Sequence, residues 1–247
     1  GILVLIKNIA AADRMKRMKY QVVLWDFDGT LVDSSPGLFR SLGRMFERMG
    51  RPVPGEEVLR KFIGPPIVYS LKTYTGMSDE DAEKAVWLFR EDYEAGGCYL
   101  SKVYDGLPEL LGRLRERGIK TGVATLKPEK TARHLLEYLG IDHLIDTCIG
   151  NRNDEKGAIT KKDIIETALD RLGWTDKSRV VLIGDSVYDA DGAITAGIDF
   201  VGAAYGFGLL PEQAEELGCC YVAESPADLE PFFFGPGDCN AAAGAVK

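Results

Sequence analysis

The chain has 247 residues, 45% of them hydrophobic and 28% charged. This composition is typical of a globular protein with one large core, or with a core and one small additional domain. The net charge of −8 and the lack of a dense basic stripe argue against a nucleic acid polymer as a partner. With two histidines and no Gly-x-Ser-x-Gly motif, histidine-dependent acyl transfer is disfavoured, so carboxylates are the expected acids and bases.

Both ends of the chain are expected to lie outside the core. Residues 1–19 begin with an apolar run too short to span a bilayer, and their basic cluster follows that run, unlike the order in an export signal. We therefore expect an N-terminal extension, no membrane association and a cytoplasmic location, where the five unpaired-looking cysteines would stay reduced. Residues 231–247, with three consecutive phenylalanines and an alanine-rich end, are expected to form a C-terminal tail.

Short apolar segments alternate with helical patterns in residues 20–37 and 103–230, as in βαβ units that build a parallel sheet. Helices are predicted where apolar residues recur at helical spacing, here at residues 107–117, 128–139 and 162–172. Strands are predicted at residues 22–25, 121–124, 147–150, 180–183 and 200–203. The predicted fold class is therefore α/β, with a parallel sheet as its core.

Residues 38–102 break this alternation, because they contain helical patterns and no convincing strand. Apolar residues share one stripe in the first helical pattern, and Ser78 to Asp81 resembles a capping box at the start of another. We expect a small α-helical cap domain inserted after the first strand. Ligands of parallel sheets bind at the carboxyl ends of the strands, so this insertion would lie over the site as a lid. The alternative is a purely structural helical bundle.

Asp26 and Asp28 directly follow the first predicted strand. Side chains alternate along a strand, so these two carboxylates are expected to point the same way. Two carboxylates in one small space either raise a pKa or require a cation, and Mg²⁺ prefers such oxygen ligands. Gly29 allows the chain to turn sharply after them. For an Asp-x-Asp pair alone, an acidic surface turn would be the better interpretation.

Three further features occur at predicted strand ends or in loops. Thr125 and the amide of Leu126 follow the second strand and could hold a phosphate oxygen. Lys161 begins a helix, where the default interpretation is a solvated charge. Asp185 and Asp189 are four residues apart on an opening helical turn, so both can face one point. Each feature is weak alone, but the four together in this order are difficult to produce by chance.

In this order, the motifs resemble those of the haloacid dehalogenase (HAD) superfamily of phosphotransferases over residues 20–229. The resemblance implies a Rossmann-like core with a helical cap between the first and second motifs. It assigns the catalytic roles of nucleophile to Asp26 and of general acid and base to Asp28, with Thr125 and Lys161 completing the set. Lys162 is the alternative to Lys161. The implied phosphate-binding residues are Gly29, Thr125, Leu126 and Lys161, and the implied Mg²⁺ ligands are Asp26, Asp28, Asp185 and Asp189, with Asp28 binding through its carbonyl.

The charges of this set explain why a metal is expected. Four aspartates would repel a dianionic phosphate ester, whereas Mg²⁺ and one lysine supply three positive charges. The expected function is therefore that of an Mg²⁺-dependent phosphomonoesterase that acts on small phosphorylated metabolites through an aspartyl-phosphate intermediate.

Further segments indicate which members of the superfamily the chain resembles. Gly64-Pro65-Pro66 in the cap and Lys127-Pro128 after Thr125 resemble phosphoglycolate phosphatases and bacterial 5′-nucleotidases. We rank phosphoglycolate first, with Gly64, Pro65 and Arg90 as candidate substrate contacts and Arg90 as a partner for a carboxylate. The alternatives are a 5′-nucleotidase, a sugar phosphomutase and, from a different class, a catalytically silent binding module. The intact acids at positions 26, 28 and 185 argue against the last of these.

Overall fold

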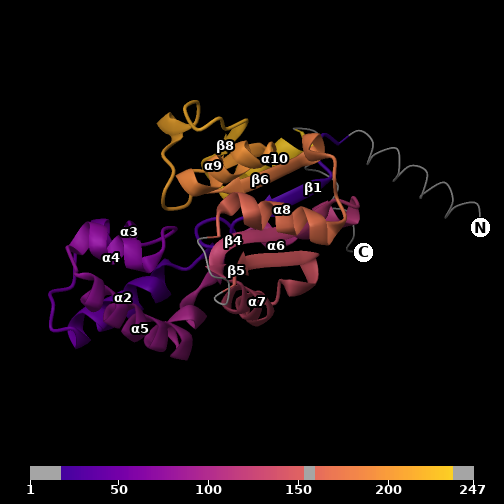
Figure 1. The fold of residues 1–247 in the computed structure, drawn as a ribbon. Helices are drawn as coiled ribbons and strands as arrows, with labels where there is room; N and C mark the ends of the chain where they lie inside the picture. Colours follow the sequence, from indigo (N-terminus) through magenta and orange to yellow (C-terminus); the bar gives the residue numbers. More distant parts are fainter. Residues whose placement is uncertain (1–17, 153–158, 236–247) are drawn as a thin grey trace, which may run out of the picture.

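The computed structural model describes residues 18–152 and 159–235 (Figure 1). Its centre is a sheet of six parallel strands in the order β5-β4-β1-β6-β7-β8. The strands are β1 (Val22–Trp25), β4 (Lys120–Pro128), β5 (Thr147–Asn151), β6 (Val180–Gly184), β7 (Asp199–Ala203) and β8 (Tyr221–Ala223). The five predicted strands are confirmed, and β8 is an additional edge strand. The α/β fold class is confirmed as well.

Strand β1 lies in the middle of the sheet, where Trp25 is opposite Val123 of β4 and Ile183 of β6. All four residues of β1 are completely buried, as expected for a strand covered on both faces. Because β4, β1 and β6 are neighbours, the residues that follow them along the chain meet at one edge of the sheet. This is the edge at which open parallel sheets bind their ligands.

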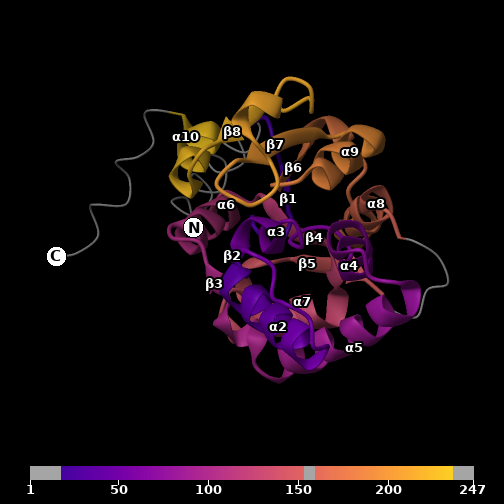
Figure 2. The ribbon, with the colours of Figure 1, turned by 90° about the vertical axis from the view of Figure 1, so that its left-hand side faces the viewer.

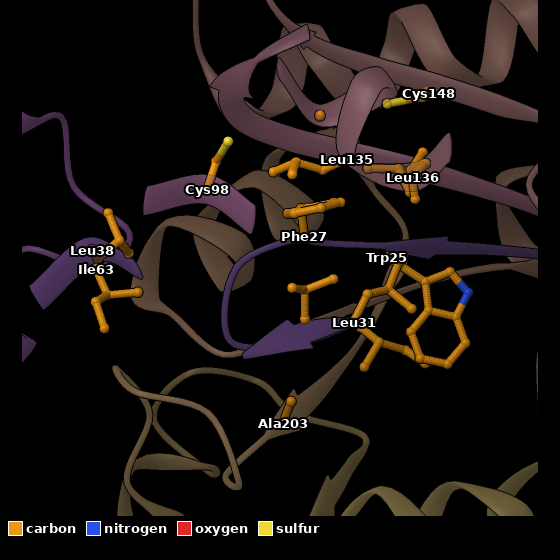
Figure 3. Packing of buried hydrophobic residues seen from close by; sticks show 14 of the residues in the cluster. Trp25, Phe27, Leu31, Leu38, Ile63, Cys98, Leu135, Leu136, Cys148 and Ala203 are labelled. Carbon is orange, nitrogen blue, oxygen red and sulfur yellow. The ribbon is translucent and has the colours of Figure 1, made fainter. Parts of the chain in front are cut away.

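Helices cover both faces of the sheet. Helices α6 (Leu107–Glu116), α7 (Glu129–Tyr138) and α10 (Leu229–Phe234) bury their apolar residues in one cluster with Trp25 and Phe27. Figure 3 shows part of this cluster, with Phe27 beside Leu135 of α7. Helices α8 (Lys161–Leu172) and α9 (Val187–Ala196) pack on the opposite face in a second cluster. None of the helices in the described residues combines the length and the apolar character that a bilayer crossing requires.

The cap, residues 35–100, consists of α2 (Ser35–Arg48), α3 (Glu56–Arg60), α4 (Ile67–Thr75), α5 (Asp79–Ala95) and the short 3₁₀ helix η1 (Gly97–Leu100). Ser78 caps α5 by accepting a hydrogen bond from the amide of Asp81, as the sequence indicated. A two-stranded antiparallel ribbon, β2 (Val32–Asp33) and β3 (Lys102–Val103), joins the cap to the core. Figures 1 and 2 show the cap helices grouped at one end of the sheet.

The prediction that a C-terminal tail starts at residue 231 is wrong, because α10 continues through this residue and packs on the core. Phe234 is buried, and the guanidinium carbons of Arg113 and Arg117 lie 4.3 and 4.7 Å from the centre of its ring. Phe234 therefore belongs to the hydrophobic core, and the partly buried Phe232 and Phe233 pack against it. Residues 236–247 of the expected tail and residues 1–17 of the expected extension lie outside the described residues.

Candidate active site

The site begins at Asp26, which follows β1 and whose amide donates to the carbonyl of Ile183 in β6. Its carboxylate is buried and forms an ion pair with Lys161, with 2.8 Å between Lys161 Nζ and Asp26 Oδ1. Lys161 Nζ also lies 2.5 Å from Asp189 Oδ1. Lys162 is exposed. The structure therefore brings Lys161, and not the alternative Lys162, to the predicted nucleophile.

The position of Lys161 depends on the packing of two helices. Thr160 forms a capping box with Asp163 and thereby sets the start of α8. Gly192 of α9 lies against the Lys161 side chain, since a Cβ atom at residue 192 would lie 2.5 Å from Lys161 Cγ. The buried stem of Lys161 thus occupies space that only a glycine leaves open in α9.

Three carboxylates converge at this point, from Asp26, Asp185 and Asp189. One ligand oxygen from each lies within 4.8 Å of the others, and all three residues are buried. Asp185 follows β6 and accepts a hydrogen bond from the amide of Phe207 at 2.8 Å. Asp189 is fixed in the first turn of α9 by a capping box with Ser186. The prediction that Asp185 and Asp189 face one point is confirmed.

Gly29 contributes to this geometry by its lack of a side chain. It has φ of 78°, and a Cβ atom there would lie only 2.2 Å from Asp185 Oδ2. The turn after Asp28 therefore brings backbone directly against an acidic side chain, which requires glycine. In this structure Gly29 packs on Asp185, and it is not among the residues that line the cavity described below.

The electrostatics of the cluster favour a bound cation. Burial and the charge of Asp189 raise the pKa of Asp26, Lys161 opposes this rise, and the resulting pKa is about 6. Burial, Asp189 and Asp26 also raise the pKa of Asp185 well above its usual range. Burial disfavours the charged form of Lys161, but the two neighbouring acids outweigh this effect and raise its pKa. One ammonium does not balance three carboxylates, and the oxygen donors fit Mg²⁺.

Asp28 has a different neighbourhood from Asp26. Lys127 Nζ lies 3.1 and 3.2 Å from the two carboxylate oxygens of Asp28, and 2.9 Å from the hydroxyl of Tyr93 in the cap. The expectation that the side chains of Asp26 and Asp28 share one cation is thus not met: the carboxylate of Asp28 is outside the group of three. Its predicted metal contact through the backbone carbonyl stays a prediction.

Sequence reasoning missed Lys127 as part of the site, and used it only as a family signature. The available signal was its spacing from Thr125: residues two apart on a strand share a face. Thr125 is itself buried, and its hydroxyl accepts from the Lys127 amide at 3.2 Å.

A cavity of about 360 Å³ lies between the cap and the core. Its core side includes Leu126 and a group of polar residues, among them Asp26, Asp28, Thr125, Lys161, Ser186 and Asp189. Its cap side is mostly apolar and includes Phe62, Ile63, Gly64, Pro65, Val86, Phe89, Arg90 and Tyr93. The candidate substrate residues Gly64, Pro65 and Arg90 therefore face the same space as the predicted nucleophile. The cavity is of the size that small-molecule sites have, about 300–1,000 Å³.

Comparison with known proteins identifies the family of this chain. The family model described as haloacid dehalogenase-like hydrolase matches residues 23–203. The chain belongs to this family. Among curated proteins, a 5′-nucleotidase of Pseudomonas aeruginosa is 35% identical over 211 residues, which cover 85% of this chain and 94% of the relative. A phosphoglycolate phosphatase of Pseudomonas fluorescens is 31% identical over 226 residues, covering 85% and 80%.

A third relative is tyrosine-protein kinase PtkA of Mycobacterium tuberculosis. It is 36% identical over 188 residues, which are 76% of this chain, and the match spans 63% of PtkA. A solved structure of PtkA superposes with a TM-score of 0.75 at 31% identity, covering 87% of this chain and 99% of that chain. The solved structure of PtkA shares the fold of this chain, and the names of the three relatives state different activities.

Proposed function

We propose that this protein is an Mg²⁺-dependent phosphomonoesterase that hydrolyses small phosphate esters through a phosphorylated Asp26. The observation that carries the proposal is the buried group of Asp26, Asp185, Asp189 and Lys161, of which Asp26, Asp189 and Lys161 line the cavity between cap and core. Membership of the haloacid dehalogenase-like hydrolases supports it. A catalytically silent binding module is disfavoured. Burying three acids around one lysine costs stability, and it would not help the protein to bind a neutral ligand.

Asp26, Asp185 and Asp189 are the residues whose side chains would hold the metal ion. When bound, Mg²⁺ would offset their charge and that of the phosphate oxygens. Lys161 keeps a positive charge beside Asp26, so that this buried carboxylate stays ionised. Thr125 and Leu126 line the cavity, where the hydroxyl of Thr125 and the amide of Leu126 would hold phosphate oxygens.

The reaction would follow in two displacements. An oxygen of Asp26 attacks phosphorus, the ester P–O bond breaks, and the leaving oxygen takes a proton from Asp28. A water molecule then attacks the phosphorus of the aspartyl phosphate and gives its proton to Asp28, which releases inorganic phosphate and restores both aspartates. Phosphoryl transfer needs little beyond such positioning and charge compensation.

We rank a nucleoside 5′-monophosphate above phosphoglycolate as the substrate, which reverses the ranking made from sequence. Phe62 and Phe89 line the cap side of the cavity, so a planar base would find apolar contacts there. Phosphoglycolate needs cations for its carboxylate, but Lys61 and Lys72 of the cap do not line the cavity, and Lys127 is engaged by Asp28. Phosphoglycolate stays the second candidate because Arg90 lines the cavity.

A substrate panel with Mg²⁺ tests this proposal. We expect kcat/KM for 5′-mononucleotides to exceed that for phosphoglycolate by about tenfold, which corresponds to about 1.4 kcal/mol. Replacing Arg90 by Met should lower kcat/KM for phosphoglycolate and leave that for nucleotides nearly unchanged. The matched control is Arg60→Met, because Arg60 is an exposed cap residue paired with Glu56. A tenfold preference for phosphoglycolate would reverse the ranking, and no hydrolysis of any ester would refute the proposed function.

A further inference from the structure

Asp28 is connected to the cap through one side chain. Lys127 lies at the end of β4, and its ammonium contacts both carboxylate oxygens of Asp28 at 3.1 and 3.2 Å. The same ammonium donates to the hydroxyl of Tyr93, on α5 of the cap, at 2.9 Å. A lysine has three protons to donate, and these contacts account for them. The predicted general acid therefore shares its partner with a residue of the cap.

The Lys127 ammonium is enclosed. Its side chain is only 7% exposed, and its Nζ lies 4.8 Å from the centre of the Tyr93 ring and 5.6 Å from that of Phe27. A charged group that is this little exposed is stable only with good partners, so loss of one contact is costly. The orientation of Asp28 is thus tied to the placement of Lys127.

Tyr93 is held rigidly on the cap. Its ring stacks on Phe89, with 5.3 Å between ring centres and 16° between ring planes, and both residues are buried. The hydroxyl of Tyr93 consequently moves with α5. Any movement of the cap away from the core would separate this hydroxyl from Lys127 Nζ, while Lys127 and Asp28 both belong to the core.

We propose that Lys127 is a positioning residue that orients the Asp28 carboxyl group toward the leaving group. Through its contact with Lys127, Tyr93 makes this orientation depend on the closed position of the cap. The proposal rests on the proposed function, in which Asp28 protonates the leaving oxygen. It has one chemical consequence: protonation would be efficient only when the cap covers the substrate. A leaving group that departs without a proton would not depend on Lys127 or Tyr93.

The test compares two kinds of ester in the full-length protein with Mg²⁺. p-Nitrophenolate leaves without protonation, whereas the alkoxide of the better alkyl ester in the substrate panel requires it. For Lys127→Met we expect kcat/KM to fall at least about 30-fold with the alkyl ester and less than about threefold with p-nitrophenyl phosphate. A structural role of Lys127 would lower both values equally.

Tyr93→Phe is the second variant, and it keeps the ring and its stacking on Phe89. We expect a loss of about fivefold in kcat/KM for the alkyl ester only, and no further loss when it is added to Lys127→Met. Tyr99→Phe is the matched control, because Tyr99 at the end of the cap also contacts the core through its hydroxyl, 2.8 Å from His134 Nε2, but away from Asp28. Its activity should equal that of the unmodified protein.

Each outcome is decisive. Equal losses with both esters, or losses from Tyr93→Phe and Lys127→Met that multiply in the double variant, would overturn this inference and leave the proposed function intact. If Lys127→Met does not fold, Tyr93→Phe alone decides by its selectivity between the two esters. If the unmodified protein hydrolyses neither ester, the proposed function itself is refuted, and the role of Lys127 with it.

Discussion

Lys161 Nζ lies 2.8 Å from Asp26 Oδ1 in the interior of the protein, although the two residues are 135 positions apart in the chain. Only 4% of the Lys161 side chain and 11% of the Asp26 side chain are exposed. The folded sheet and α8 hold them together, and Asp189 adds a second acid on the same ammonium. A buried charge is tolerated when it is paired, so this relationship links the stability of the fold to the proposed chemistry.

Replacing Lys161 by Met should destabilise the protein, because it leaves Asp26 and Asp189 without their buried cation. Loss of one partner of a buried ion pair costs about 3–5 kcal/mol. We expect a decrease of about this size in the free energy of unfolding by urea, measured without metal near neutral pH. Lys162→Met, one position along on the exposed side of α8, should change it by less than about 0.5 kcal/mol. Equal effects of the two substitutions would contradict the assignment of Lys161.

Binding of Mg²⁺ should strengthen as the pH rises through about 6, the pKa of Asp26 in the folded protein. The folded pKa lies above the unfolded value of 3.8, so the folded state prefers the protonated acid. Ionisation of Asp26 therefore lowers the stability of the metal-free protein between these two values. Mg²⁺ binds the ionised form, and the gain in melting temperature on adding Mg²⁺ should be larger near neutral pH than near pH 5.

The control for this measurement is Asp26→Asn, in which residue 26 cannot ionise. It should show a smaller dependence on pH, and the part that remains comes from Asp185, whose pKa is also raised. A gain in melting temperature that is independent of pH in the unmodified protein would contradict the account.

In activity measurements, a chelator should abolish turnover, and Ca²⁺ should restore little, because its longer bonds and variable coordination suit this site less well than Mg²⁺ does.

Gly29→Ala should displace Asp185 from the acidic cluster. The added methyl group would lie 2.2 Å from Asp185 Oδ2, at a φ of 78° that L-residues avoid. We expect a loss of more than about 2 kcal/mol in unfolding free energy and weaker Mg²⁺ binding in a thermal-shift titration. Gly50→Ala separates the two causes, since Gly50 has φ of 65° and open space around it. It should cost only about 1 kcal/mol and leave Mg²⁺ binding unchanged.

The core of the fold could be predicted from the sequence because buried parallel strands such as β1 are continuous apolar runs. Strand β8 was missed because it has only three residues, two of them partly exposed, so no pattern marks it. The burial of Phe234 was missed for a different reason: it depends on Arg113 and Arg117 of α6, more than a hundred residues earlier.

In the candidate site, too, some residues could be predicted from the sequence and others could not. Asp26, Asp185 and Asp189 could be predicted because strand ends and the first turn of a helix place side chains in known directions. Lys161 and Lys162 could not be separated, since that choice depends on how α8 packs against Gly192 of α9. The contact between Lys127 and Tyr93 requires the cap to be docked on the core, which no local pattern encodes.

The central claim is that Asp26 carries the phosphoryl group. It is tested most directly in Asp28→Asn, which should form the aspartyl phosphate from p-nitrophenyl phosphate but hydrolyse it slowly, because no base activates the water. After acid quenching, peptide mass spectrometry should locate phosphate on the peptide that contains residue 26, in nearly stoichiometric amount, and Asp26→Asn should show none. Phosphate on another residue, or more than about a tenth of normal turnover in a folded Asp26→Asn variant, would contradict the account.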